Sequence, residues 1–377
     1  MAQKTAEPSR EDDTPIPWDH NLLLWPFAGA TLALDLFGSW LGDGPGSLPA
    51  SADVELAWTS PNAVALELAT MRLRDFSSQR HGDPVLICAP YAVHGALIAD
   101  FAPGHSIVEA LQRGGLDRVY VTDWRSARPT MRYLTIDDYL SDLNVAIDEI
   151  GPPVDLIGLC QGGWLALLFA ARFPNKVRRL VLAGAPVDVS VPSALSHAVA
   201  TLAPELFEGM VDTGTGLVSG RQMLDTWRQS QAQIRDALQL DATDDLLQRF
   251  EAWNAATTDL PGTYYLEVVN AIFRENRIPA GNFVALGHRI DPARVTVPVF
   301  LLAGTHDQIV PAGQALATAS LVGTPASLIE ATCEPCDHLG LFMGRNTIAQ
   351  SWRRIAHWLA TSTGATGARP TARARPG

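Results

Sequence analysis

The five residues Gly-Leu-Cys-Gln-Gly at 158–162 constrain the fold of this chain most strongly, because they indicate a sharp turn between a strand and a helix. An apolar run at 153–157 precedes them and a longer one at 163–171 follows. Glycine on both sides leaves room for a turned backbone that a bulkier residue would block. The pattern is that of a nucleophile elbow with cysteine at the usual serine position, so Cys160 is a candidate nucleophile that forms a thioester. The alternative is a buried cysteine that packs beside a structural turn.

Short apolar runs of β type alternate with longer helical runs over most of the chain. This alternation predicts an α/β fold, with a mostly parallel sheet and helices on both faces. The predicted strands lie at residues 71–76, 85–89, 118–122, 154–157, 180–183, 299–303 and 327–330. The predicted helices lie at residues 107–112, 136–150, 163–172, 313–321 and 347–359.

The alternation stops after residue 187, and the sheet is predicted to use residues 53–187 and 295–361. From 188 to 294 no clear buried strand is visible, and apolar residues recur at helical spacing. A segment inserted here lies above the carboxyl ends of the strands, where α/β folds bind their ligands. We therefore predict a helical cap over Cys160. A helical decoration remote from the site is the alternative.

The two ends of the chain differ from the rest in composition. Residues 1–16 and 362–377 are polar or rich in small residues, so both are predicted to be disordered. Residues 17–52 form an apolar segment that Pro26, Gly29 and Asp35 interrupt, which favours a packed or interfacial helix over a membrane span.

Composition excludes several classes of function. The net charge of −12 argues against a nucleic-acid partner. Four cysteines are too few and too unevenly spaced for a disulfide framework, and no secretory leader is visible, so we expect a cytoplasmic protein. The lone Cys-x-x-Cys at 333–336 is a weak zinc signal and is interpreted as structural. Neither a metal cluster nor a dinucleotide glycine pattern is evident, so no metal and no cofactor are predicted.

A catalytic thiol needs a base and an acid, and in this architecture both follow the nucleophile in the chain. Asp307 stands at the exit of a predicted buried strand, and His338 lies in a loop between the last predicted strand and the final helix. The alternative for Asp307 is a helix cap. His306 competes with His338, but as the neighbour of Asp307 it would have difficulty reaching both Asp307 and Cys160.

The chemistry assigns a role to each residue. His338 takes the proton of Cys160, and Asp307 orients and stabilises the resulting imidazolium. The tetrahedral oxyanion needs preorganised N–H donors. We predict that these are the backbone amide of Gln161 and an amide of the loop after residue 89, at Ala92 or Val93.

Several further motifs complete a family pattern. They are Gly-Leu-Cys-Gln-Gly-Gly at 158–163, Val-Thr-Asp-Trp at 121–124, Leu-Thr-Ile-Asp-Asp-Tyr at 134–139, Gly-Ala-Pro-Val-Asp at 184–188 and, in the insertion, Trp253, Asp-Leu-Pro-Gly at 259–262, Phe273 and Asn276. From about residue 85 to 359 the chain resembles the polyhydroxyalkanoate synthase family, particularly its shorter form. The resemblance implies an α/β-hydrolase fold and a cysteine that is acylated by a hydroxyacyl-CoA and passes the acyl group to a hydroxyl. It places Cys160, Asp307 and His338 on the nucleophile, acid and base.

Three positions depart from that family pattern. Gln308 follows the acid where the family usually has histidine, Asp337 precedes the base where glycine is typical, and His94 stands where asparagine is more familiar. These changes leave the three catalytic positions intact.

Three functions remain open from the sequence. The first is an acyltransferase of the polyhydroxyalkanoate synthase type with a hydroxyacyl-CoA substrate. The second is a thioesterase, esterase or intracellular polyester depolymerase that uses the same triad, and the third is a non-catalytic granule-binding protein. The predicted partners are acyl-CoA or polyester, a polyester granule surface, and either a second copy of the chain or a second, non-catalytic subunit, as the resemblance implies.

Overall fold

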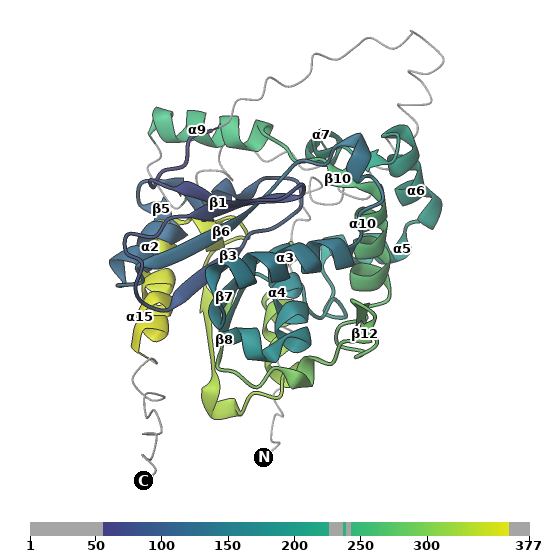
Figure 1. Ribbon diagram of the computed structural model, residues 1–377. Helices are drawn as coiled ribbons and strands as arrows, with labels where there is room; N and C mark the ends of the chain where they lie inside the picture. Colours follow the sequence, from purple (N-terminus) through teal and green to yellow (C-terminus); the bar gives the residue numbers. More distant parts are fainter. Residues whose placement is uncertain (1–55, 226–236, 239–242, 362–377) are drawn as a thin grey trace, which may run out of the picture.

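A computed structural model describes residues 56–225, 237–238 and 243–361 (Figure 1). The predicted disordered ends and the apolar segment 17–52 lie outside the described residues. No helix in the described ranges is both long enough and apolar enough to span a bilayer.

The described chain is built around an eight-stranded sheet. Its strands, in spatial order, are β1 (Ala63–Glu67), β2 (Met71–Asp75), β6 (Arg118–Trp124), β3 (Pro84–Cys88), β7 (Val154–Leu159), β8 (Val177–Ala183), β13 (Val299–Gly304) and β14 (Ile329–Glu334). The β1–β2 and β2–β6 pairs are antiparallel, and every pair from β6 to β14 is parallel. The predicted α/β fold with a mostly parallel sheet is therefore confirmed.

Helices cover both faces of the sheet. Side chains alternate along the strands, so Leu86 and Cys88 of β3 pack into one apolar cluster while Val85 and Ile87 pack into another. The first cluster lies under α3 (Ile136–Ile150) and α4 (Gln161–Arg172), and the second lies under α2 (Ile107–Arg113) and α15 (Arg353–Thr361) (Figure 1). Burial on both faces explains why the central strands are continuous apolar runs.

Local signals set the helix ends. The side chain of Thr135 accepts a hydrogen bond from the Asp138 N–H, and Asp138 in turn accepts one from the Thr135 N–H, which forms a capping box at the start of α3. The helix ends at Gly151, whose φ of +90° favours glycine. At the start of α2, the Ser106 side chain accepts a single capping hydrogen bond from the Glu109 N–H at 2.9 Å.

In the described ranges, the segment between β8 and β13 is largely helical. The division of the chain into a cap at 188–294 and a core stays a prediction. The helices of this segment are α5 (Ala194–Thr201), α6 (Pro204–Thr213), α7 (Gly220–Asp225), α9 (Asp244–Ala255), α10 (Gly262–Glu267) and the π-helical segment η4 (Val268–Arg274). Two small antiparallel ladders join it, β9 (Leu217–Val218) with β10 (Leu260–Pro261) and β11 (Val284–Ala285) with β12 (His288–Arg289). In Figure 1, α5, α6, α7 and α10 lie beyond one end of the strands, and α9 lies above β1.

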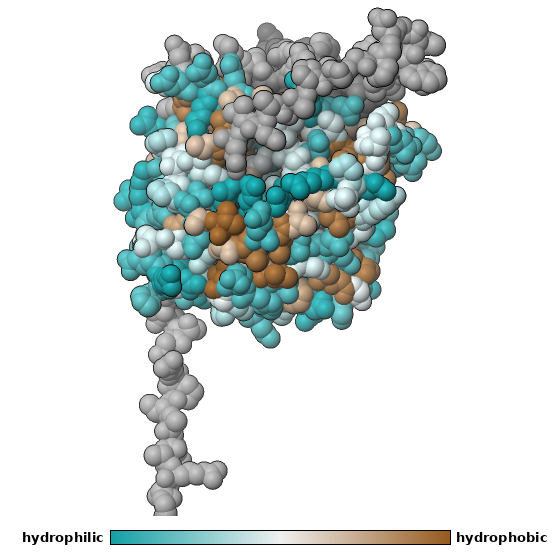
Figure 2. Space-filling model, turned by 45° about the horizontal axis from the view of Figure 1, so that its top comes forward, coloured by the Kyte–Doolittle hydropathy of each residue, from teal (hydrophilic) through white to brown (hydrophobic). Residues whose placement is uncertain are grey.

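The remaining elements are short. They are β4 (Asp100–Ala102), β5 (His105–Ser106), α11 (Ala312–Leu316), α12 (Thr318–Leu321), α13 (Gly340–Met343), α14 (Arg345–Thr347) and the π-helical η7 (Ile348–Trp352), with 3-10 turns η1 (Ala96–Ala99), η2 (Pro129–Met131), η3 (Pro174–Lys176), η5 (Pro292–Arg294) and η6 (Ala326–Leu328). Hydrophobic residues gather in a patch on the face shown in Figure 2, bordered by hydrophilic ones.

Most predicted elements differ from the structure by one to three residues at an end, and three of them differ as follows. The strand predicted at 327–330 begins later, at Ile329, because the 3-10 turn η6 occupies the preceding residues. The helix predicted at 313–321 is divided into α11 and α12. The helix predicted at 347–359 contains the π-helical stretch η7, which widens one turn.

Candidate functional site

The elbow forms where β7 ends and α4 begins. Cys160 joins the two with φ of 48° and ψ of −118°, a backbone conformation that residues other than glycine rarely adopt. The Cys160 N–H donates to the Ala183 carbonyl of β8 at 2.9 Å, and its own carbonyl accepts from the Gly163 N–H at 2.9 Å. These bonds hold the strained residue, whose side chain is half-buried.

The glycines of the elbow are required by close contacts. A Cβ on Gly158 would lie 2.5 Å from the Gly163 Cα, and one on Gly162 would lie 2.1 Å from the Cys88 carbonyl oxygen. Neither contact is sterically tolerable, so both positions need glycine, as the sequence predicted. The second contact also places the start of α4 directly against the end of β3.

Asp307 and His338 meet on the loops that follow β13 and β14. The His338 Nδ1 lies 2.6 Å from the Asp307 Oδ2, and both side chains are almost fully buried. The other carboxylate oxygen accepts from the N–H groups of Ile309 and Val310 at 2.9 and 2.8 Å. Asp307 therefore stabilises its own turn and also binds the imidazole, but it does not cap a helix, because α11 begins at Ala312 with Pro311 as its N-cap.

The charges around His338 decide its protonation. Burial alone would lower the pKa of His338, but the negative charges of Asp307 and the Cys160 thiolate, with hydrogen bonds to both side chains, raise that pKa well above its usual value. Since Nδ1 faces Asp307, the other ring nitrogen, Nε2, is left for the thiol of Cys160. The structure thus brings together the three side chains that the sequence named, and their arrangement can hold an imidazolium beside a thiolate.

The predicted oxyanion donors lie on either side of the contact between β3 and α4. Gln161 is the first residue of α4, so its N–H has no intrahelical acceptor, and the N-terminal end of the helix favours negative charge. Ala92 and Val93 lie on the loop after β3, which starts beside the elbow because Gly162 packs on the carbonyls of Cys88 and Ala89. Within the described ranges, no hydrogen-bond acceptor faces the amides of Gln161, Ala92 or Val93. Their role as donors stays a prediction.

A cluster of buried tyrosines packs the loop after β3 against α3 and α10. Tyr264 of α10 packs against Tyr91 and Tyr139, with ring centroids 5.3 and 4.8 Å apart. Burial is the main reason that the pKa of Tyr264 is raised, and the negative charges of neighbouring groups, Tyr91 first, add to it. Tyr264 follows the helical spacing of core aromatics, and no sequence signal separates it from them.

The neighbours of the acid and base have simpler roles. His306 and Gln308 are exposed. The carboxylate of Asp337 accepts a hydrogen bond from the Gly340 N–H at 2.8 Å, which fixes the turn between His338 and α13. The departure at position 337 therefore has a local structural function.

The three other cysteines do not join the site chemistry. Burial raises the pKa of Cys88 and of Cys336 to about 12, so both thiols are protonated at neutral pH. Cys333 is exposed, whereas Cys336 is buried in the core. In the part of the chain that the structure describes, no group of histidine, cysteine or acidic side chains is arranged to hold a metal ion.

Comparisons with known proteins agree with this geometry. A poly(3-hydroxyalkanoate) polymerase subunit PhaC from Synechocystis is 27% identical over 81% of this chain and 86% of its own. The PhaC subunit from Allochromatium vinosum is also 27% identical, over 73% of this chain and 81% of its own. Among solved structures, the mouse alpha/beta hydrolase domain-containing protein 10 superposes with a TM-score of 0.50 at 15% identity, over 81% of this chain and 100% of its own.

The family model that matches describes the alpha/beta hydrolase fold and covers residues 94–342, which is more than half of the chain. That range contains the elbow, the segment between β8 and β13, and the Asp307–His338 pair. The order of these parts along the chain and their meeting at the carboxyl ends of the strands are those of the matched fold. The chain therefore belongs to the alpha/beta hydrolase fold family.

Proposed function

We propose that this protein is an acyltransferase of the polyhydroxyalkanoate synthase type, with Cys160 as the acyl carrier. The observation that carries the proposal is a cysteine held in a strained elbow beside a buried Asp307–His338 pair. Relatives named poly(3-hydroxyalkanoate) polymerase subunits, which match along most of this chain, supply the substrate class. A thiolate suits such a substrate because exchange between thioesters is close to balanced in energy, and the enzyme thioester stays reactive toward an alcohol.

The reaction has two transfers, both at the same carbonyl carbon. In the first, the Cys160 thiolate attacks the hydroxyacyl-CoA carbonyl, the carbon–sulfur bond to CoA breaks, and His338 gives its proton to the departing CoA thiolate. In the second, His338 takes the proton of an acceptor hydroxyl, the alkoxide attacks the enzyme thioester, and Cys160 leaves as thiolate. Asp307 stabilises the imidazolium, which is present before the first proton transfer and again after the second.

The oxyanion of each tetrahedral intermediate is proposed to lie between the Gln161 amide and the loop after β3. Preorganised N–H donors stabilise such charge without reorganisation at the moment of reaction. The free amides described above are suited to this role, and the helix end at Gln161 adds to the positive potential.

Partners follow from the same proposal. The relatives are named subunits, so we expect this chain to work with a second subunit or with a second copy of itself. An apolar patch such as that of Figure 2 suits a hydrophobic partner or a polyester surface. Size-exclusion chromatography with and without substrate tests whether assembly accompanies activity.

Product analysis with purified protein and 3-hydroxybutyryl-CoA tests the function. We expect release of CoA together with oligomeric or insoluble polyester. Release of CoA with free hydroxybutyrate as the sole acyl product would instead assign the protein to the thioesterases. No CoA release, with binding to polyester granules retained, would indicate the non-catalytic alternative.

A further inference from the structure

The loop after β3 is clamped by a segment that lies far away in the sequence. Residues 253–259, here called the clamp segment, run from the end of α9 toward β10. The His94 ring stacks on Trp253 with ring centroids 4.2 Å apart and planes inclined by 22°. The His94 Nε2 also lies 3.2 Å from the Asn254 carbonyl oxygen. The side chain of His94 is therefore held by two consecutive residues of the clamp segment.

The backbones of the loop and the clamp segment are also paired. The Thr258 N–H donates to the Val93 carbonyl at 2.8 Å, and His94 and Thr257 form an antiparallel bridge. Because a trans peptide directs its C=O and N–H to opposite sides, this bond turns the His94 N–H away from the clamp segment. The clamp segment thus fixes the orientation of the peptide between Val93 and His94.

Two further bonds hold the clamp segment in place. The Tyr91 hydroxyl donates to the Asp259 carbonyl at 3.3 Å, and the Ala127 N–H donates to the same oxygen at 2.9 Å. Trp253 is buried against Phe101 and Phe250, with centroids 6.2 and 5.4 Å apart. The clamp is therefore anchored in the core as well as on the loop.

His94 is suited to a fixed contact and not to proton transfer. Burial lowers the pKa of His94 to about 4, which the hydrogen bonds to Asn254 only partly offset. The imidazole is uncharged at neutral pH, so Nε2 carries a hydrogen and donates to the Asn254 carbonyl. An asparagine side chain also has an N–H donor and could replace this bond, although it could not stack as well on Trp253.

We propose that His94 is a positioning residue: through Trp253 and Asn254, the clamp segment orients the loop 91–94 so that its free amides stabilise the acyl oxyanion. When the Cys160 sulfur bonds to the carbonyl carbon, the π electron pair moves to the oxygen, and the loop amides and the Gln161 N–H donate to it. This inference rests on the proposed role of Cys160 as the nucleophile.

Two reagents distinguish the role of the clamp segment from the role of Cys160 as nucleophile. Iodoacetamide alkylates a thiolate without an oxyanion, whereas a trifluoromethyl ketone analogue of the hydroxybutyryl group forms a tetrahedral adduct that needs the oxyanion donors. We compare wild type with His94→Ala and His94→Asn, using His105→Ala as the matched control. His105 is also a buried histidine that bonds a backbone carbonyl, with Nδ1 2.7 Å from the Met343 oxygen, but it lies outside the clamped loop.

We expect the His94→Ala substitution to weaken ketone binding strongly and to change the alkylation of Cys160 only slightly. His94→Ala should weaken ketone binding about 10- to 100-fold, which is less than the roughly 100- to 1,000-fold loss on removing one oxyanion donor, because the amides remain and only their orientation is loosened. Alkylation of Cys160 should change by less than about 3-fold. His94→Asn should recover part of the ketone affinity, and His105→Ala should leave it unchanged. If His94→Ala binds the ketone as tightly as wild type does, the clamp proposal is wrong. If neither reagent modifies Cys160 in wild type, the proposed function itself fails.

Discussion

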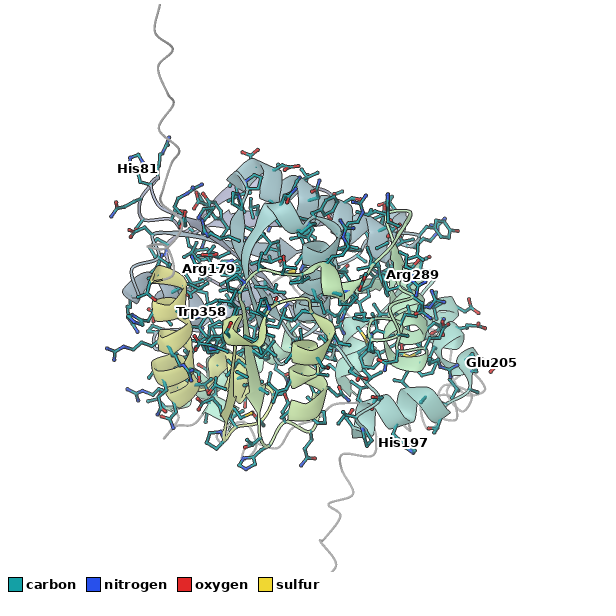
Figure 3. The ribbon with its side chains drawn as sticks, turned by 90° about the horizontal axis from the view of Figure 1, so that it is seen from below. His81, Arg179, His197, Glu205, Arg289 and Trp358 are labelled. Atoms are coloured by element: carbon teal, nitrogen blue, oxygen red, sulfur yellow. The ribbon has the colours of Figure 1, made fainter. Side chains whose placement is uncertain are left out.

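Two buried carboxylates, Asp155 and Asp307, lie at opposite ends of the parallel strands and have very different partners. Asp155 lies in β7 near the start of the strand and is fully buried. Its oxygens accept from the Arg178 guanidinium at 3.0 and 2.9 Å and from the Arg179 guanidinium at 2.9 and 2.8 Å. Arg179 also lies against the Trp358 ring, 5.9 Å from its centroid (Figure 3).

Asp307, at the other end of the strands, binds one imidazole and two backbone amides. A guanidinium keeps its charge at any physiological pH, whereas an imidazole can gain and lose a proton. The difference shows how one fold uses a buried carboxylate in two ways. Asp155 fixes the packing of neighbouring strands, and Asp307 is proposed to control a proton that can be transferred.

The largest expected effect is on the reaction. In Asp307→Asn, the amide cannot stabilise the imidazolium and favours the wrong tautomer of His338, so the rate of CoA release should fall about ten-thousand-fold. Steady-state kinetics with 3-hydroxybutyryl-CoA measures this. The matched control is Asp337→Asn, whose side-chain oxygen can still accept from the Gly340 N–H, and it should change the rate by less than about 5-fold. Equal losses in the two variants would contradict the separate roles.

The next effect is on stability at the opposite end of the strands. Asp155→Asn leaves Arg179 buried beside a neutral partner, so the free energy of unfolding should fall by about 3–5 kcal/mol. Arg178 retains an ion pair with Asp83 at 2.6 Å. Urea unfolding measures the loss, and the activity of the folded fraction should be nearly unchanged.

An exposed ion pair provides the control for Asp155. Glu330 and Arg354 form a pair at 2.9 Å, and both side chains are exposed, so Arg354→Gln should change the free energy of unfolding by less than about 1 kcal/mol. A smaller loss in Asp155→Asn than in this surface variant would show that the buried cluster is not a structural anchor.

A smaller effect comes from the elbow itself. Gly162→Ala places a methyl group 2.1 Å from the Cys88 carbonyl oxygen, so the backbone must shift, and we expect a loss of about 1–3 kcal/mol in unfolding free energy together with lower activity. Gly209 of α6 has open space where its Cβ would lie, so Gly209→Ala should be neutral or slightly stabilising. Thermal melts of the two variants test this, and a stable, fully active Gly162→Ala would be inconsistent with the close contact.

The smallest expected effect concerns the protonation of His338. Since the pKa of His338 is raised, its ring should remain protonated well above pH 6.5 in the free enzyme. In Asp307→Asn the carboxylate charge is lost while burial still disfavours the charged ring, so the His338 pKa should fall. Histidine NMR titration of both proteins measures the change. An unchanged midpoint would mean that Asp307 does not set the charge of His338.

The sequence predicted the parts of this molecule that follow from local pattern. The apolar central strands could be predicted because buried parallel strands are continuous apolar runs. The order of Cys160, Asp307 and His338 could be predicted because the acid and the base follow the nucleophile in this architecture. The edge strand β1 was not predicted, since most of its side chains are exposed and carry no alternating pattern. The π-helical segments have no periodic signal of their own either.

The contacts around the loop after β3 could not be predicted for a different reason. His94 was noticed as a departure and Trp253 as a motif residue, but His94 and its partner Asn254 are 160 residues apart in the sequence. Only the fold brings them together. The same holds for Tyr264, whose helical spacing is identical to that of an ordinary core residue.

The acyl group that Cys160 is proposed to carry can be detected directly. Brief incubation with 3-hydroxybutyryl-CoA, acid quenching and peptide mass spectrometry should find one hydroxybutyryl group on the peptide that contains Cys160. Hydroxylamine should remove that group, and Cys160→Ala should neither carry it nor release CoA. An acyl group on another residue, or CoA release by Cys160→Ala at the wild-type rate, would contradict the role of Cys160 as the acyl carrier.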